Sequence, residues 1–266
     1  QGIEGSTTDY VSTIPHLEFA IFQMMFAIIT PALITGAVAG RMKFKALFLF
    51  IILWSVIVYY PMAHMVWGLG GFLAKIGSID FAGGNVVHIS SGVSALVLCI
   101  VLGKRKDYLR VQYHVHNIPF VVLGASLLLF GWFGFNAGSA LQANELAVHA
   151  FMTTGLSAAA GMISWMLMDV FMSGKPTLVG SVTGMVVGLV AITPGAGYVP
   201  IWASIIIGLV GSPICYLMIS KVKQKLGYDD ALDAFGCHGV GGIFGGFATA
   251  IFTTPDLALD KANIGL

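Results

Sequence analysis

Most of this chain consists of long apolar segments separated by short polar or glycine-rich turns. A helix needs about 20 mostly apolar residues to cross the hydrocarbon core of a bilayer. Eight segments approach this length, and we predict each to be a membrane-spanning helix: residues 17–38, 46–67, 81–102, 117–136, 147–172, 177–193, 199–219 and 234–252. The pattern predicts an all-α polytopic membrane protein with a single transmembrane domain over residues 1–266.

The amino-acid composition agrees with a bundle in lipid rather than in water. Hydrophobic residues make up 57% of the chain and charged residues only 9%, and the mean hydropathy is +0.90. Because soluble domains contain about 25% charged residues, this chain has too little polar surface to cover a globule in water. The 34 glycines are typical of closely packed membrane helices. The net charge of +1 gives no indication of a nucleic-acid partner.

The positions of the basic residues test the division into spans independently. Eleven of the thirteen follow the first, third, fifth or seventh predicted span: Arg41, Lys43, Lys45, Lys104, Arg105, Lys106, Arg110, Lys175, Lys221, Lys223 and Lys225. Positively charged loops stay on the cytoplasmic side of a membrane. We therefore predict a multi-pass protein of the cell membrane, with residue 17 at the outer side and cytoplasmic loops near residues 39–45, 103–116, 173–176 and 220–230.

Two of the predicted spans begin with related sequences. The third begins DFAGGNVVH at Asp80 and the eighth begins DAFGCH at Asp233, so each has an acid, an aromatic residue, glycine and then a histidine. The third and eighth spans are five positions apart, an odd number, so they cross the membrane in opposite directions. This is typical of an inverted-topology repeat, which commonly places a substrate site near the middle of the bilayer. The acids are suited to cap the free N–H groups at the start of each helix.

The histidines of these two segments are the first candidates for chemistry. His88 and His238 lie inside their spans, where a charged side chain costs about 2.5–3.5 kcal/mol or more. A neutral imidazole offers one donor and one acceptor nitrogen, so a pair could pass a hydrogen bond or a proton along a dry path. A single histidine is as readily explained by a bond to a neighbouring helix. Their pairing on related spans favours a function.

Aromatic residues gather near the predicted outer ends of several spans. Trp67 ends the second span, Trp132 and Phe135 lie at the end of the fourth, and Phe22 and Phe26 share one face of the first. They fit either the interfacial aromatic belt of a membrane protein or a cage for a small cation, in which each ring contributes about 0.5–2 kcal/mol. Spacing alone does not separate these two interpretations.

The sequence motifs of common enzymes are missing. The chain contains no P-loop, no GxSxG motif and no metal-ligand box. Gly180, Gly184 and Gly188 have the spacing of helix packing rather than of a phosphate-binding loop. We therefore predict a protein that is not an enzyme, with no cofactor and no metal site.

Several separated strings resemble the Amt/Mep/Rh family of ammonium transporters, in family order and at nearly family spacing over almost the whole chain. They are FQMMF from Phe22, AHMVWG from Ala63, DFAGG from Asp80 with Val87-His88, GWFGFNAGS from Gly131, Thr193-Pro194 with Gly197-Tyr198, and DAFGCHG from Asp233. Trp67 and the DFAGG string resemble the Amt branch rather than the Rh branch. The resemblance implies a helical bundle with an inverted-topology pseudo-repeat that moves ammonium or ammonia across the membrane.

The resemblance also implies a role for each site residue. Trp67, Phe26 and Ser139 match an outer recruitment site with Phe22 and Asp80 beside it, Phe26 and Phe135 match a stacked gate, and His88, His238 and Trp132 match the lining of a narrow apolar pore. In the implied mechanism the recruited cation loses a proton, and ammonia crosses the pore past the twin histidines.

The resemblance implies partners and an extent as well. Family members are homotrimers with one pore in each subunit, and many bind a cytoplasmic PII-type regulator. They usually have eleven spans, so we expect this chain to be a partial copy that lacks the first two and the last. Two alternatives stay open. One is an ammonium sensor that signals to a partner, and the other is a different small-solute channel or carrier, although the chain lacks the NPA pair of water channels.

Overall fold

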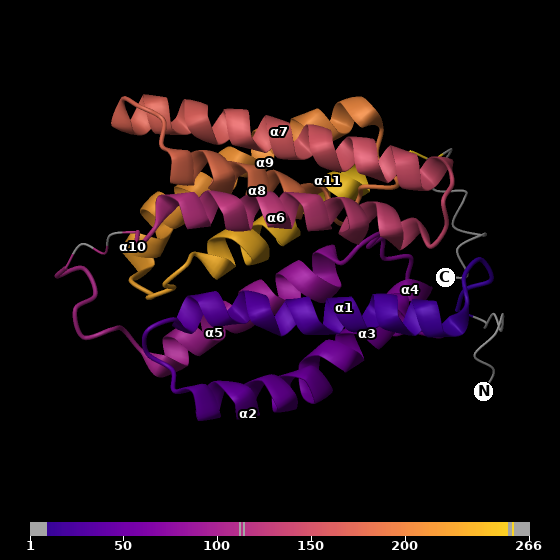
Figure 1. The fold of residues 1–266 in the computed structure, drawn as a ribbon, viewed down its shortest axis with the longest axis horizontal. Helices are drawn as coiled ribbons and strands as arrows, with labels where there is room; N and C mark the ends of the chain where they lie inside the picture. The colour runs from indigo at the N-terminus through magenta and orange to yellow at the C-terminus, as the bar shows by residue number, and fades with distance from the viewer. Residues whose placement is uncertain (1–9, 112, 114, 255–256, 258–266) are drawn as a thin grey trace.

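The computed structural model describes residues 10–111, 113, 115–254 and 257, and every regular element among them is a helix. Figure 1 shows the longer helices lying side by side, most of them along one axis. The first elements are α1 (His16–Thr35), η1 (Gly36–Val38), α2 (Phe44–Trp54), η2 (Ser55–Tyr59), α3 (Tyr60–Trp67), α4 (Phe72–Lys75), η3 (Gly84–Ile89) and α5 (Ser90–Leu102). The later elements are α6 (Ile118–Ala137), η4 (Gly138–Ala140), α7 (Glu145–Ser173), α8 (Leu178–Ile192), α9 (Ile201–Leu217), η5 (Met218–Val222), α10 (Lys223–Leu226), η6 (Phe235–Gly239) and α11 (Val240–Phe252).

Consecutive elements join into helices that are long and apolar enough to cross a membrane. The described residues contain seven of them: His16–Val38, Phe44–Lys75, Gly84–Leu102, Ile118–Ala140, Glu145–Ser173, Ile201–Leu226 and Phe235–Phe252. Each overlaps a predicted span, so the prediction of an all-α polytopic membrane protein is confirmed. The span predicted at residues 177–193 is different, because α8 has only 15 residues. Seven full-length helices and one short helix therefore replace the predicted eight spans.

Protein, rather than lipid, encloses helix α8, so this helix need not be long enough to cross a bilayer. The side chains from Val187 to Ile192 have almost no exposed surface. A β-carbon on Gly161 of α7 would lie 2.5 Å from the Gly184 carbonyl oxygen and 2.9 Å from the Gly188 α-carbon. In the turn that follows α8, side chains of α7 bond to backbone carbonyl oxygens. Irregular backbone is stable at membrane depth only where protein satisfies it in this way.

Large apolar side chains cover the outside of the bundle. Phe130, Phe171 and Ile251 expose 80%, 79% and 74% of their surface. Contact with water costs about 25 cal/mol for each Å² of such surface, whereas lipid tails match it. The outer surface is therefore suited to a bilayer.

The connections that carry most of the basic residues lie at one end of the bundle, on the left in Figure 1. They are the turns after α1, α5 and α7 and the segment around α10. The start of α1 and the α6–α7 connection lie at the other end. We call these the basic end and the opposite end. Their separation agrees with the alternation of basic loops in the sequence.

The two segments with related sequences, η3–α5 and η6–α11, run in opposite directions. The start of η6 lies beside the end of α5, because the Arg41 guanidinium bonds to the carbonyl oxygens of both Gly103 and Asp229. The start of η3 lies at the opposite end, where the Phe81 N–H donates to the Pro194 carbonyl oxygen at 2.9 Å. Each segment opens with a π-helical turn that continues as an α-helix. This antiparallel pair is the arrangement expected of an inverted repeat.

Candidate functional site

The two candidate histidines face each other inside the bundle. The Nδ1 atoms of His88 and His238 lie 3.3 Å apart, and the rings stack with centroids 5.2 Å apart. If both rings are neutral, one Nδ1 donates and the other accepts, so one Nε2 is an acceptor and the other a donor. The Nε2 atom of His88 is buried and has no hydrogen-bond partner within the described part of the chain. The pair can therefore offer hydrogen bonds to a small polar molecule that passes it.

Glycines allow the two histidine-bearing segments to approach this closely. A β-carbon on Gly92 would lie 2.1 Å from the Gly239 amide nitrogen, and one on Gly242 would lie 3.1 Å from the His88 β-carbon. A larger residue at Gly92 would therefore push the segments apart. Both histidines lie in π-helical turns, a local geometry that is frequent at functional sites.

A buried aspartate caps the start of each histidine-bearing helix. Asp80 accepts hydrogen bonds from the backbone N–H groups of residues 83–86. Asp230 accepts them from residues 234 and 235, at 3.1 and 2.8 Å. Burial raises the pKa of the Asp80 carboxyl, and the four N–H donors oppose that shift. The cap predicted at Asp233 is wrong, because its carboxylate is paired with Lys223 and its backbone is left-handed, with φ of 59°.

Aromatic rings continue from the histidine pair toward the opposite end. The Phe26 and Phe135 rings have centroids 4.5 Å apart, and Phe135 stacks on His88 at 6.0 Å. Trp132 stacks on His88 at 5.4 Å, and its Nε1 donates to the Thr193 hydroxyl at 3.0 Å. The structure thus brings together the residues predicted for the gate and for the pore.

A small cavity lies beside the Phe26 ring, near the start of α1 at the opposite end of the bundle. It has a volume of about 50 Å³ and is lined mainly by aromatic side chains: Tyr10, Phe19, Phe22, Gln23, Phe26, Trp67, Phe81, Ser139 and Leu141. The Trp67 ring lies 5.6 Å from that of Phe26 and is fixed by a 2.8 Å bond from its Nε1 to the Asp80 carbonyl oxygen. The Ser139 hydroxyl donates to the Phe135 carbonyl oxygen at 2.9 Å, so its lone pairs stay available as acceptors.

A larger cavity of about 460 Å³ contains the histidine pair and Trp132 and is otherwise almost wholly apolar. The side chains of Phe22 and Phe26 line both cavities, and their rings contact each other edge to face at 4.9 Å. These two rings therefore form part of the wall that the two cavities share.

The comparison with known protein families identifies the chain. The model of the Ammonium Transporter Family matches residues 4–265. The chain belongs to the ammonium transporter family. This confirms the resemblance seen in the sequence, and the family is one of transporters rather than enzymes.

Relatives and solved structures extend this result. The chain is 53% identical over 257 residues to an ammonium transporter of Bacillus subtilis, covering 97% of this chain and 63% of the relative. It is 56% identical over 262 residues to a putative ammonium transporter of Methanothermobacter thermautotrophicus, covering 98% and 63%. The crystal structure of Saccharomyces cerevisiae Mep2 superposes with a TM-score of 0.90 at 42% identity, covering 96% of this chain and 59% of Mep2. The chain thus spans less than two thirds of the length of these proteins.

Two polar contacts of this chain were not predicted from the sequence. The Trp132 indole N–H donates to the Thr193 hydroxyl, although the two residues are 61 positions apart in the sequence. No local sequence pattern predicts such a pairing. Asp230 caps the helix of His238, and here a signal was present. Asp80 and Asp230 each precede their histidine by eight residues, so aligning the two segments on the histidines pairs these two acids.

Proposed function

We propose that this chain forms the pore of a protein that transports ammonium, taking up the cation and conducting ammonia. The observation that carries this proposal is the pair of stacked imidazoles in an almost wholly apolar cavity, behind the closely packed rings of Phe26 and Phe135. A bare cation is strongly disfavoured in such a cavity. A neutral molecule that both donates and accepts hydrogen bonds matches the imidazole pair.

The small cavity is suited to hold the ammonium cation before the cation loses a proton. The ring faces of Trp67 and Phe26 attract a small cation, each by about 0.5–2 kcal/mol once water is removed. The Ser139 hydroxyl oxygen can accept a hydrogen bond from ammonium, which potassium cannot donate. Phe22 lines this cavity, and Asp80 fixes the backbone beside it.

Selection against potassium follows from the step after recruitment. Ammonium can give up a proton and continue as ammonia, whereas potassium stays charged and cannot leave its water for the apolar cavity. His88 and His238 would bond to ammonia inside the cavity, beside the stacked Trp132 ring. The released proton either moves through the imidazoles or returns to the outer side.

The proposed protein lies in the cell membrane with its basic end in the cytoplasm, because positively charged loops stay on that side. Residue 17 and the small cavity then face outward. We propose further that it forms a homotrimer with a pore in each subunit and that a PII-type regulator acts at the basic end. Both assemblies rest on the family relationship.

An ammonium pulse across proteoliposomes that hold the full-length protein tests this function. We expect a saturable ammonium signal, measured both as a current and as a change of internal pH, and no response to an equal potassium pulse. Protein-free liposomes are the control. Folded protein that moves neither charge nor ammonia would contradict the proposal.

A sensor is the second candidate, because a structure titled "Sensor Amt Protein" superposes on this chain with a TM-score of 0.85 at 31% identity. The superposition covers 90% of this chain and 62% of the chain in that structure. The same pulse separates the two candidates. Ammonium binding without flux would favour a sensor, and saturable flux favours a transporter.

Replacing Trp67 by leucine is expected to weaken recruitment without changing the pore. The substitution keeps an apolar side chain but removes the cation–π contact, so the half-saturation concentration for ammonium should rise about 2- to 30-fold, which corresponds to about 0.5–2 kcal/mol. Maximal flux should stay within about twofold of the unaltered protein, because the chemistry at the histidines is unchanged.

Trp202→Leu is the matched control for this prediction. Trp202 is exposed on α9 and its ring contacts Phe252, away from both cavities. An equal rise of the half-saturation concentration in this control would mean that any lost tryptophan weakens transport, and the recruitment role of Trp67 would then be wrong.

A further inference from the structure

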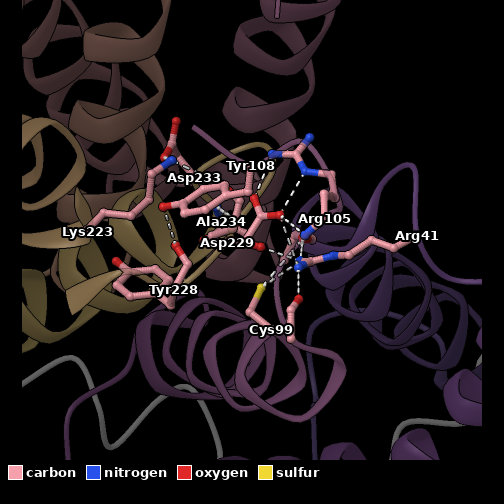
Figure 2. A network of polar contacts seen from close by, with 12 residues as sticks. Arg41, Cys99, Arg105, Tyr108, Lys223, Tyr228, Asp229, Asp233 and Ala234 are labelled. Carbon is pink, nitrogen blue, oxygen red and sulfur yellow. Dashed lines mark hydrogen bonds and ion pairs between the residues drawn. The ribbon is translucent and has the colours of Figure 1, made fainter. Parts of the chain in front are cut away.

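The loop before η6 is held by a cluster of charged residues at the basic end, shown in Figure 2. The Asp229 carboxylate has no exposed surface and accepts two bonds from the Arg105 guanidinium, at 2.8 and 2.6 Å, and one from the Arg105 backbone N–H at 2.8 Å. Arg41 lies 3.4 Å away and also bonds to the Asp229 carbonyl oxygen. Burial by itself would raise the pKa of the Asp229 carboxyl, but Arg105 and Arg41 outweigh it and lower that pKa.

The neighbouring residues of this loop are anchored to separate parts of the chain. The Tyr108 hydroxyl donates to the Tyr228 carbonyl oxygen at 3.1 Å, and the Ala231 N–H donates to the Ala37 carbonyl oxygen at 3.2 Å. Lys223 bonds to the Asp230 carbonyl oxygen at 3.1 Å. Segments that follow α1, α5 and α9 therefore fix this loop together.

The fixed loop ends in the cap of the helix that carries His238. Asp230 follows Asp229 directly, and its carboxylate accepts the N–H groups of Ala234 and Phe235. His238 lies in the π-helical turn that begins at Phe235. Its Nδ1 atom is 3.3 Å from that of His88. A displacement of the loop would move the cap, the turn and then the imidazole.

The helix of His88 is held differently, although a buried aspartate caps it as well. The loop at Asp80 is anchored by neutral groups, namely the N–H of Phe81 on the Pro194 carbonyl oxygen and the Trp67 indole on the Asp80 carbonyl oxygen. Ile79 occupies the position that corresponds to Asp229. A buried aspartate therefore caps each histidine-bearing helix, but only the cap of the His238 helix is tied to charged groups within the described part of the chain.

We propose that Asp229 is a positioning residue for the pore: paired with Arg105 and Arg41, it holds the loop so that Asp230 caps the His238 helix and keeps that imidazole against His88. This inference rests on the proposed transport function for its flux readout. The inference gives the charged cluster at the basic end a role in conduction and cation selection. The small cavity, where ammonium would be recruited, lies at the opposite end.

Asp229→Asn and Arg105→Lys test this inference in the full-length protein. The asparagine places an NH₂ group among guanidinium donors, and the lysine keeps the charge at a partly exposed position but loses the two-point contact. We expect maximal ammonium flux per folded molecule to fall about tenfold for Asp229→Asn and less for Arg105→Lys, because a small displacement of a reacting group lowers rates steeply. The half-saturation concentration should stay within about twofold, since recruitment occurs at the other end.

Asp169→Asn is the matched control. Asp169 is also buried and accepts bonds from the Thr177 N–H and hydroxyl at the start of α8, at 3.1 and 2.8 Å. These bonds lie outside the two histidine-bearing segments. An equal loss of flux in this control, or a loss in Asp229→Asn that arises only from a higher half-saturation concentration, would overturn the inference. Normal maximal flux in both Asp229→Asn and Arg105→Lys would also overturn the inference.

A measurement independent of flux is the ¹⁵N chemical shift of the labelled imidazoles in membranes. The shifts report the bond between the two Nδ1 atoms, which should weaken in Asp229→Asn and persist in Asp169→Asn. If the unaltered protein showed no ammonium flux, the proposed function would fail, yet these shifts would still decide whether Asp229 positions His238. Unchanged shifts in Asp229→Asn would overturn the inference.

Discussion

Replacing both histidines, in His88→Ala/His238→Ala, is expected to lower the ratio of ammonium flux to potassium flux by at least about tenfold, equivalent to about 1.4 kcal/mol. The two rings line the larger cavity, and the ring of His88 stacks on Phe135. Without them ammonia loses its hydrogen-bond partners, and water can fill the space they leave. A hydrated path would remove the penalty that rejects potassium, so either ammonium flux stops or potassium begins to leak.

The measurement is the response of proteoliposomes to equal pulses of ammonium and of potassium. His149→Ala is a suitable control, because this histidine lies on α7 and its Nε2 contacts the Val199 carbonyl oxygen at 2.8 Å rather than the pore. We expect the control to keep the ammonium preference. Selective flux that persists unchanged in the double variant would show that the imidazole pair has no part in conduction.

The substitution Gly92→Ala should have the second large effect, on both folding and transport. A β-carbon at this position would lie 2.1 Å from the amide nitrogen and 2.4 Å from the α-carbon of Gly239. Backbone atoms cannot move aside as a flexible side chain can, so the segments η6 and α5 must separate. Overpacking of this kind costs about 1–3 kcal/mol or more, and His238 adjoins Gly239, so its bond to His88 should lengthen.

Thermal unfolding in detergent measures the first effect and proteoliposome flux the second. We expect the midpoint of unfolding to fall by about 2–12 °C and ammonium flux per folded molecule to decrease. Gly246→Ala on α11 is the control, because a β-carbon there meets nothing within 4 Å. If the two variants had the same stability and flux, close approach at Gly92 would not be what brings the histidines together.

The sequence determined the class of the protein and most of its topology. Hydropathy is a property of contiguous residues, so a run such as residues 17–38 identifies a span without knowledge of its neighbours. The basic residues that follow alternate spans then predicted which loops share an end, and those loops lie together in the structure. The motifs around Asp80, Trp132 and His238 identified the family, and the family model confirms it.

Only the tertiary structure decided the features that depend on contacts between distant segments. Helix α8 can be shorter than a span because neighbouring helices such as α7 and α9 enclose it, and its own apolar sequence cannot report what surrounds it. The cap belongs to Asp230 rather than Asp233, because Lys223 takes the carboxylate of Asp233 and the loop is held in place from Arg41 and Arg105. The distance between the two imidazoles likewise depends on Gly92 meeting Gly239, a contact between residues that lie 147 positions apart. A local pattern fixes which residues are apolar or ionisable, whereas packing between segments fixes which of them meet.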